Sequence, residues 1–212
     1  MKLISFLTKE LERIFSKSIT LVRFYGVYYK NIVKREVELA GINSGDSVLF
    51  IGGGAVPCTA LQIASITGAK VKVIDVDPVA IDRTKKIITK LNLSHCVKAQ
   101  LISGQSINAS KFSVIHIARQ AVPHNKILEN VVKRVSDDTR ILLRSNSCCF
   151  EKSDKLYNQN CKCQHIKRMK QSIFGSRETF MLTIEKNSKR ESEKVNSYTD
   201  SFRSGAVGTV VS

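Results

Sequence analysis

Apolar residues recur at helical spacing over the first forty positions of the chain. They stand at positions 3, 4, 7, 11, 14 and 15, and again at intervals of three or four between Val22 and Val37. This spacing predicts two helices, over residues 3–20 and 19–39, because residues three and four apart share one helix face. Gly41 is suited to end the second helix. We therefore expect residues 1–42 to form a helical extension.

Short apolar runs alternate with helical patterns over residues 43–186. The runs predict strands at residues 48–51, 71–75, 97–102, 112–118 and 140–145. The helical patterns lie at residues 57–67, 78–91 and 125–135, and FMLTIE at 180–185 predicts a last hairpin or an edge strand. This alternation predicts an α/β domain over residues 43–186 with a mostly parallel sheet and helices on both faces. Residues 187–212 have neither periodicity, and we expect a disordered tail.

The segment VLFIGGGAVP, residues 48–57, carries the strongest single indication of function. A short apolar strand runs into three consecutive glycines and then into a helical pattern, which is the first unit of a nucleotide-binding α/β domain. Glycine allows the tight turn and lets a ligand approach the main chain closely. Residues Gly52, Gly53 and Gly54 are therefore candidate binding residues.

An acidic residue at the end of the next strand strengthens this interpretation. Asp75 lies 23 residues after Gly52, and an acid about 20 residues beyond the glycines hydrogen-bonds a ribose hydroxyl in this class of site. The alternative for Asp75 is a helix-capping carboxylate. Asp77, directly before Pro78, is the better candidate for that cap.

The glycines depart from the GxGxxG fingerprint of dinucleotide sites. Three glycines are followed by Ala55, Val56 and Pro57, so the third glycine of the fingerprint, which allows close helix packing, is absent. A nucleoside without phosphates, such as S-adenosylmethionine, needs only the first turn and the ribose acid. We therefore favour S-adenosyl-L-methionine over a dinucleotide as the ligand. The alternative for the three glycines is an ordinary tight turn between a strand and a helix, with no ligand.

Further polar side chains follow the third and fourth predicted strands. Gln105 could contact an adenine ring, and a simple loop residue is an equally good interpretation. Arg119 could bind a substrate or methionine carboxylate through two parallel hydrogen bonds. Gln120 and His124 lie near it, at the carboxyl ends of strands where ligands bind in such sheets. His116, inside an apolar strand, is better explained as a structural histidine than as a base.

Composition and charge narrow the function classes. The chain has 34 Lys and Arg against 18 Asp and Glu, a formal charge of +16, which attracts nucleic acid, anionic membranes and acidic metabolites. Residues 161–171 are basic, yet a solvated face explains them better than an RNA footprint, because no Trp and no interleaved aromatics accompany them. Nucleic acid is therefore possible as a partner but not favoured. No apolar run reaches membrane-spanning length, and we expect a cytoplasmic protein without membrane contact.

Five soft ligands cluster in the sequence after the fifth predicted strand. Their spacings are CC and CxC, with one histidine nearby, and not the CxxC pairs that surround a zinc ion well. We expect no metal site, and free thiols in a connecting segment. The residues are Cys148, Cys149, Cys161, Cys163 and His165.

The aromatic run RFYGVYY, residues 23–29, lies on the second predicted helix. Tyr25, Tyr28 and Tyr29 would cover at least two faces of that helix. A core stripe is the default interpretation, and a hydroxyl that points into the cofactor cleft is the alternative.

Over residues 20–186 the chain resembles the archaeal and bacterial nicotianamine synthase-like proteins. The resemblance rests on the aromatic run followed by KREVEL, on FIGGGAVPCTALQIA and VKVIDVDPVAID, and on FSVIHIA and DDTRILLRS. It implies a Rossmann-like class I methyltransferase fold. It also implies transfer of the aminocarboxypropyl group of S-adenosylmethionine to the amine of a small molecule or amino acid, with methylthioadenosine as by-product and a nicotianamine- or opine-like metal chelator as product.

The resemblance also implies roles for residues outside the nucleoside site. In the family, a tyrosine of the aromatic segment and a glutamate of a helical N-terminal domain handle the attacking amine. Tyr25 or Tyr28 falls in the matching segment, and Glu10 and Glu12 are candidates for the glutamate. Only about 45 residues precede the first predicted strand, so we expect this helical domain to be shortened.

Two other functions remain open at this point. A sulfonium activates all three attached carbons, so orientation decides which one is attacked. The same fold therefore supports a conventional methyltransferase of a small molecule or RNA, which would release S-adenosylhomocysteine. A shortened N-terminus also suits a non-catalytic protein that retains only nucleoside binding.

Overall fold

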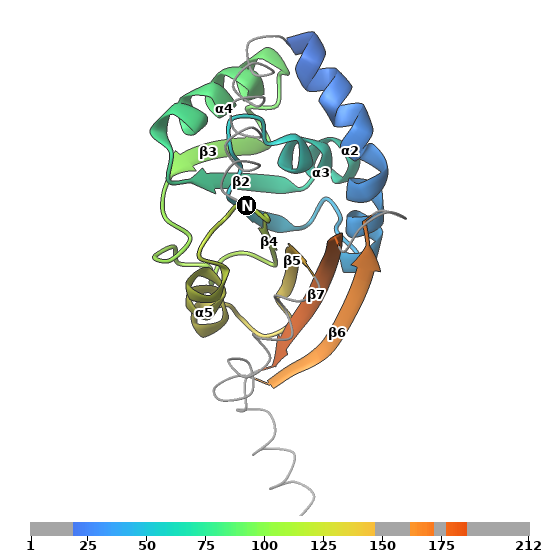
Figure 1. The fold of residues 1–212 in the computed structure, drawn as a ribbon, viewed down its shortest axis with the longest axis vertical. Helices are drawn as coiled ribbons and strands as arrows, with labels where there is room; N and C mark the ends of the chain where they lie inside the picture. The colour runs from blue at the N-terminus through green and yellow to red at the C-terminus, as the bar shows by residue number, and fades with distance from the viewer. Residues whose placement is uncertain (1–18, 147–161, 172–176, 186–212) are drawn as a thin grey trace, which may run out of the picture.

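A computed structural model describes residues 19–146, 162–171 and 177–185 (Figure 1). Its centre is a seven-stranded sheet in the order β3-β2-β1-β4-β5-β7-β6. The first five strands of this order are parallel, and β7 is antiparallel to both of its neighbours. The strands are β1 (Ser47–Ile51), β2 (Lys70–Asp75), β3 (Val97–Leu101), β4 (Val114–Ile117), β5 (Arg140–Asn146), β6 (Lys162–Lys170) and β7 (Arg177–Glu185).

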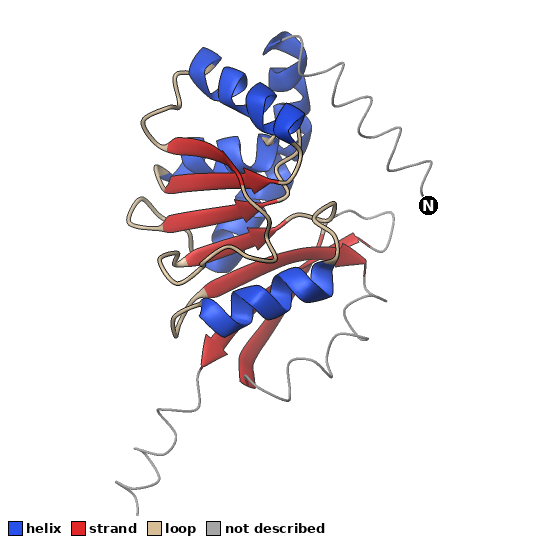
Figure 2. Ribbon diagram, turned by 90° about the vertical axis from the view of Figure 1, so that its left-hand side faces the viewer, coloured by secondary structure: helices blue, strands red, loops and turns tan. Residues whose placement is uncertain are grey.

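Helices cover both faces of the sheet, as the alternating pattern predicts. One face packs against α2 (Ile19–Ala40), α3 (Cys58–Thr67) and α4 (Pro78–Lys90), which share a buried apolar cluster with Val48, Phe50 and Val73. The other face packs against α5 (His124–Arg134). Figure 2 shows α5 in front of the sheet, apart from the other helices. The strands β1, β2, β4 and β5 contribute apolar side chains to both clusters and are strongly buried, whereas β3 at the edge contributes only to the first cluster and is largely exposed.

The ends of the crossover helices confirm the local predictions. Gly68 ends α3 in the left-handed conformation at φ 73°, and its amide donates to the Ala64 carbonyl. Asp77 caps α4, because its side chain accepts a hydrogen bond from the Val79 amide at 2.8 Å, with Pro78 in the first turn. Pro57 differs slightly from expectation, since it stands at the cap position immediately before α3.

The basic segment after the fifth strand corrects the sequence prediction. We expected a connecting segment there, but residues 162–170 form β6. The segment FMLTIE lies in β7, which pairs with β5 on one side and with β6 on the other, so it belongs to a hairpin and is not an edge strand. Lys167, Arg168 and Lys170 are exposed on β6, in agreement with a solvated basic face.

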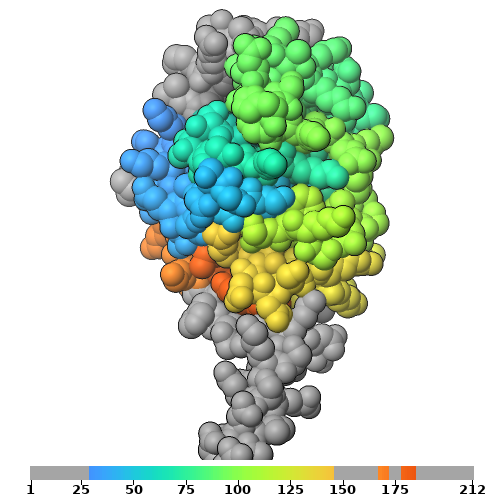
Figure 3. Space-filling view, turned by 180° about the vertical axis from the view of Figure 1, so that it is seen from behind, coloured from blue at the N-terminus to red at the C-terminus, as the bar shows by residue number. Residues whose placement is uncertain are grey.

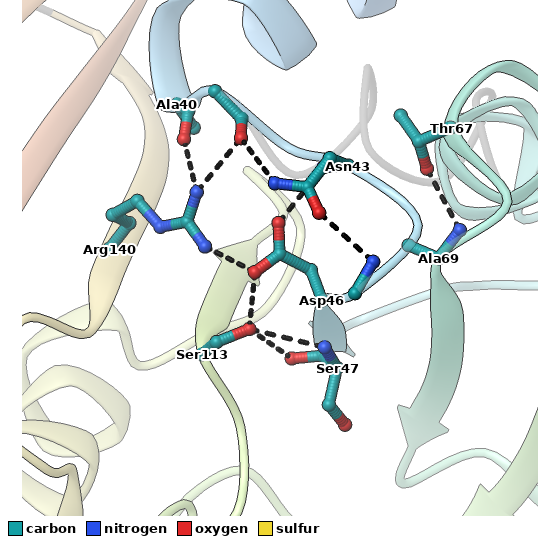
Figure 4. Close-up of polar contacts among 10 residues, drawn as sticks. Ala40, Asn43, Asp46, Ser47, Thr67, Ala69, Ser113 and Arg140 are labelled. Atoms are coloured by element: carbon teal, nitrogen blue, oxygen red, sulfur yellow. Dashed lines mark hydrogen bonds and ion pairs between the residues drawn. The ribbon is translucent and has the colours of Figure 1, made fainter.

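A polar network closes the amino-terminal edge of the sheet. The Arg140 guanidinium donates to the Ala40 carbonyl at 2.7 Å and to the Gly41 carbonyl at 3.0 Å, and it pairs with Asp46 (Figure 4). Asp46 also accepts from the Ser113 hydroxyl at 2.7 Å. The network therefore connects the end of α2 to the starts of β1, β4 and β5. Figure 3 looks at this edge, where segments far apart in the sequence meet on one surface.

Some predictions fall outside the described residues. The helix expected over residues 3–20 reaches only Ile19 and Thr20 of the described part, as the start of α2. The tail expected over residues 187–212 and most of the cysteine cluster lie outside it as well. Cys163 and His165 lie in the first part of β6, and only the backbone of these two residues is described.

Candidate functional site

The glycine turn lies between β1 and α3 and needs glycine for conformation and for space. Gly52 and Gly54 have φ angles of +83° and +62°, in the left-handed region that favours glycine. A Cβ on Gly52 would stand 2.6 Å from the Ala121 Cβ, and one on Gly53 would stand 2.3 Å from Val73 Cγ1. Real carbon atoms do not approach so closely, so residues 52 and 53 cannot carry a side chain without rearrangement. Gly52 and Gly53 are buried against these side chains, so they serve the packing of the chain itself, and Gly54 is the half-buried glycine of the turn.

Asp75 connects the end of β2 to this turn. Its carboxylate accepts hydrogen bonds from the Gly54 amide at 2.8 Å and from the Asp77 amide at 3.0 Å. An ionised carboxylate can accept about four hydrogen bonds, so capacity for about two remains. The side chain is only partly buried. Asp75 therefore faces the glycine turn and has capacity to accept hydroxyl donors as well.

The two outer carbonyls of the glycine turn are also held in place. Gln120 donates to the Gly52 carbonyl at 2.9 Å, and the Thr84 hydroxyl donates to the Gly54 carbonyl at 3.0 Å. The sequence places Gln120 near the site without a role, and Thr84 lies inside the helical pattern predicted over residues 78–91. With these bonds, β2, α4 and the loop after β4 all fix the turn before any ligand arrives.

Three exposed apolar side chains surround the same edge of the sheet. Val76, Leu101 and Val122 expose 68%, 51% and 71% of their surface; Val76 directly follows β2, Leu101 ends β3, and Val122 lies in the loop after β4. Leu101 is the cross-strand partner of Asp75, and Val122 follows the alanine that packs against Gly52. These side chains offer apolar surface at the edge of the sheet where the glycine turn lies. Sequence reasoning missed them, because apolar residues beside a strand read as part of the core.

The other predicted polar residues lie on loops at this edge. Gln105 is exposed on the loop after β3. Its backbone N–H donates to the Ser103 hydroxyl at 3.2 Å. Arg119 is exposed two residues beyond the end of β4. His124 starts α5 and lies 3.2 Å from the Ala118 carbonyl. The loops thus bring these residues to the same side of the sheet as the glycine turn.

Tyr25 and Tyr28 lie in the first half of α2, where only the backbone is described. Tyr29, the next residue, is half-buried, and the guanidinium carbon of Arg144 stands 5.7 Å from the centre of its ring. This is the distance of a cation–π contact. Glu10 and Glu12 lie outside the described residues.

A buried ionic cluster lies beneath the carboxyl edge, and no pattern in the sequence predicts it. Glu36 of α2 is fully buried, and it accepts two hydrogen bonds from Arg144, at 2.8 and 2.6 Å, and one from Thr179 at 2.6 Å. His116 Nε2 stands 3.3 Å from the same carboxylate, and its ring stacks on Phe50 with centres 4.6 Å apart. His116 is fully buried, which confirms its interpretation as a structural histidine.

Charge within this cluster follows from its contacts. Burial alone would raise the pKa of Glu36, but the charge of Arg144 and the contact with His116 hold that pKa well below its usual range. Burial lowers the pKa of His116, and Glu36 opposes this only in part. The histidine is therefore neutral near pH 7. Because the carboxylate can only accept, Nε2 carries the hydrogen, and within the described part of the chain Nδ1 has no partner.

The described residues can be compared with what a metal site and a membrane-spanning helix require. Among the residues placed by the structure, no group of three or more His, Cys, Asp or Glu side chains could hold a metal ion. Cys58 and Cys96, the cysteines whose side chains are described, form no disulfide. No helix within the described ranges has the length and apolar character needed to cross a membrane.

Comparisons with known proteins point to one family. A family profile described as nicotianamine synthase protein matches residues 9–174 of the chain. An L-histidine 2-aminobutanoyltransferase from Yersinia pestis is 25% identical over 142 residues, which are 66% of this chain and 53% of that protein. The chain thus spans about half the length of the curated relatives it matches.

Solved structures give the same fold. MtNAS in complex with methylthioadenosine (MTA) and tNA is similar at a TM-score of 0.74 and 21% identity, covering 87% of this chain and 74% of that one. A glutamate-to-glutamine mutant of MtNAS in complex with S-adenosylmethionine gives 0.72 and 20%, with coverages of 86% and 75%. An RNA methyltransferase from Salinibacter ruber in complex with S-adenosyl-L-homocysteine gives 0.58 and 15%, with coverages of 73% and 90%. The predicted class I methyltransferase fold is confirmed.

Proposed function

Because the chain belongs to the nicotianamine synthase family, we propose that it binds S-adenosylmethionine as a substrate and transfers its aminocarboxypropyl group to the amine of a small molecule. One observation carries the proposal: a turn of main chain without side chains lies beside the Asp75 carboxylate, which is bonded to the Gly54 amide. A relative of this family, MtNAS, has been crystallised with S-adenosylmethionine.

The nucleoside would fit the residues that surround this turn. The sugar hydroxyls would donate to the remaining lone pairs of Asp75, and residues 52–54 would let the ligand approach the main chain. Val76 and Leu101 offer an exposed apolar surface to the flat adenine ring, and covering them removes apolar area from water. Gln105 lies on the loop after β3 and would hydrogen-bond the edge of the ring.

Arg119 is our candidate for the carboxylate of the methionine part. It is exposed just beyond β4, next to the Gln120 that holds the glycine turn. A guanidinium can form two parallel hydrogen bonds to a carboxylate, which fixes its orientation as well as its position. This orientation decides which of the three carbons on the sulfonium faces the acceptor.

The transfer itself is a single displacement. The lone pair of the acceptor amine attacks the methylene carbon bound to the sulfonium, a nitrogen–carbon bond forms, and the sulfur–carbon bond breaks. Its electron pair stays on sulfur, which leaves as neutral methylthioadenosine, and the amine loses a proton. A tyrosine of residues 23–29, with Tyr25 and Tyr28 as the candidates from the sequence, would orient the amine. Glu10 and Glu12 remain candidates to receive the proton.

We propose an amino acid or a related amine as acceptor and a metal-chelating product. The curated relatives are named L-histidine 2-aminobutanoyltransferase, which supports an amino-acid acceptor. The strong positive charge of the chain would attract carboxylate-bearing acceptors. Added amino and carboxylate groups give the product the ligands that bind transition metals.

Labelled substrate tests this proposal on the product side. The chain is incubated with S-adenosylmethionine carrying isotope in the aminocarboxypropyl carbons, together with a panel of amino acids. The proposal predicts that one acceptor gains the labelled group. Transfer of the methyl group would instead support the methyltransferase alternative, and tight binding without any transfer would support a non-catalytic nucleoside-binding protein.

A further inference from the structure

Glu36 joins four elements of the fold through one buried carboxylate. It lies on α2, and its partners are His116 on β4, Arg144 on β5 and Thr179 on β7. Both ionic side chains are strongly buried, with 11% of the Arg144 side chain exposed and none of Glu36. Apolar side chains would hold a helix on a sheet with no desolvation penalty, so a buried ion pair is weak support for stability. Its geometry, however, is directional.

Arg144 is held in a fixed orientation by this pair. Its Nε and Nη2 atoms donate to the two different oxygens of Glu36, at 2.8 and 2.6 Å. Two parallel hydrogen bonds between planar groups fix the guanidinium plane as well as its position. The Tyr29 ring lies against this fixed guanidinium, 5.7 Å from its carbon to the ring centre.

Glu36 and Tyr29 lie on the same side of α2. They are seven residues apart, which is close to two helical turns and about 10 Å along the axis. Arg144 spans the distance between them, so one cation connects the buried carboxylate to the tyrosine. The pair with Glu36 therefore fixes the cation against which the Tyr29 ring lies, and the ring also packs against the apolar cluster on this face of the sheet.

The direction of α2 places Tyr29 toward the carboxyl edge. The last residue of the helix, Ala40, bonds to Arg140 at the start of β5, whereas Tyr29 contacts Arg144, four residues further along that strand. The helix thus runs antiparallel to β5, and its earlier residues approach the edge where the glycine turn lies. It also packs on α3, which begins directly after that turn.

We propose that Arg144, anchored by Glu36, is a positioning residue that orients Tyr29 for contact with the acceptor amine. This inference rests on the proposed transfer function and adds Tyr29 to the candidates of the aromatic segment. Arg144 acts through Tyr29 and touches neither substrate. A change at Arg144 should therefore slow transfer only as long as the Tyr29 hydroxyl is present.

A double-mutant cycle with Arg144→Lys and Tyr29→Phe tests this dependence. Lysine keeps the charge but cannot form the two parallel bonds, and phenylalanine keeps the ring but removes the hydroxyl. We expect each single variant to lower kcat for methylthioadenosine release at least tenfold, with the dissociation constant for S-adenosylmethionine within threefold of wild type. The double variant should be no slower than Tyr29→Phe alone.

Arg168→Lys is the matched control, because Arg168 lies over the Phe180 ring at 5.9 Å on the exposed edge strand. It should leave kcat unchanged. The inference would be overturned if the loss of kcat in the double variant equalled the product of the two single losses, or if Tyr29→Phe kept full activity. In either case an active wild type would still support the proposed function. A wild-type chain that releases no methylthioadenosine would overturn both. If thermal unfolding shows that Arg144→Lys does not fold, Glu36→Gln replaces it in the same cycle, because the amide removes the ionic anchor of Arg144 and the same dependence on Tyr29 is expected.

Discussion

The Asp75 carboxylate accepts a hydrogen bond from the Gly54 amide at 2.8 Å, which joins the end of β2 to the turn after β1. This bond places an ionisable oxygen beside the part of the main chain that carries no side chains. The acid thereby organises the turn and still has lone pairs to offer a ligand.

Asp75→Ala should weaken S-adenosylmethionine binding by about 1 to 3 kcal/mol, roughly five- to 150-fold, because it removes the acceptor of the sugar hydroxyls. Isothermal calorimetry measures the change. Asp82→Ala is the matched control, because Asp82 pairs with Lys86 on the exposed side of α4 and both side chains are more than half exposed. Equal affinity of Asp75→Ala and wild type would remove the nucleoside site from this position.

Gly53→Ala should lower the free energy of unfolding by about 1 to 3 kcal/mol, since the new Cβ would stand 2.3 Å from a buried valine methyl. Urea unfolding measures this cost. Adding Val73→Ala removes that methyl, so the double variant should be more stable than the sum of the single effects predicts. Val71→Ala, on the same buried side of β2, gives the control double variant, which should be additive. Additivity in both pairs would show that the contact is not the cause.

Acid should destabilise the protein in two steps. His116 is buried with a lowered pKa, so the unfolded state binds its proton first, and stability falls as the pH drops below about 6.5. Glu36 also has a lowered pKa, so its contribution is present above its ordinary value of about 4.3 and is lost below it. Unfolding free energies from pH 7 to pH 3 test both signs.

His116→Gln should flatten the first of these steps, which we expect to be about 1 to 2 kcal/mol between pH 7 and pH 5. His95→Gln is its control, because His95 is exposed in the loop before β3 and its surroundings change little on unfolding. If His116→Gln keeps the full slope over this interval, the buried histidine does not cause the acid sensitivity.

Arg140→Ala should destabilise the fold without changing the affinity for S-adenosylmethionine. The guanidinium bonds two carbonyls at the end of α2 and pairs with Asp46, whose pKa is lowered by its bonds to Ser113, Asn43 and Arg140 in spite of burial. We expect a loss of about 1 to 3 kcal/mol in urea unfolding. This network lies at the edge opposite the glycine turn, so a parallel loss of affinity would argue against the separation of the two edges.

The features that the sequence predicts well are set by neighbouring residues. The positive φ angles of the glycine turn, the bond from Gly54 to the acid at the end of β2 and the Asp77 cap each lie within about twenty residues along the chain, and the structure contains all three. Periodicity also locates α2 to within a residue of its observed end. Local chemistry and the alternation of strands with helices therefore suffice to predict the fold class and, within the candidate site, the glycine turn and Asp75.

Features that depend on distant partners escape prediction. Glu36 lies in a helical pattern where a charged residue is normally solvated, and its partners stand 80, 108 and 143 residues away. The edge strand β6 is rich in lysine and arginine, and it forms only by pairing with β7. Neither feature has a signal in the surrounding residues, because tertiary contacts create both.

The nucleoside by-product tests the central claim most directly. Wild-type chain is incubated with S-adenosylmethionine and the amino-acid panel, and the released nucleosides are separated by liquid chromatography with mass detection. Transfer of the aminocarboxypropyl group predicts methylthioadenosine, in an amount equal to the modified acceptor. S-adenosylhomocysteine as the released nucleoside, or no release from tightly bound substrate, would contradict the account.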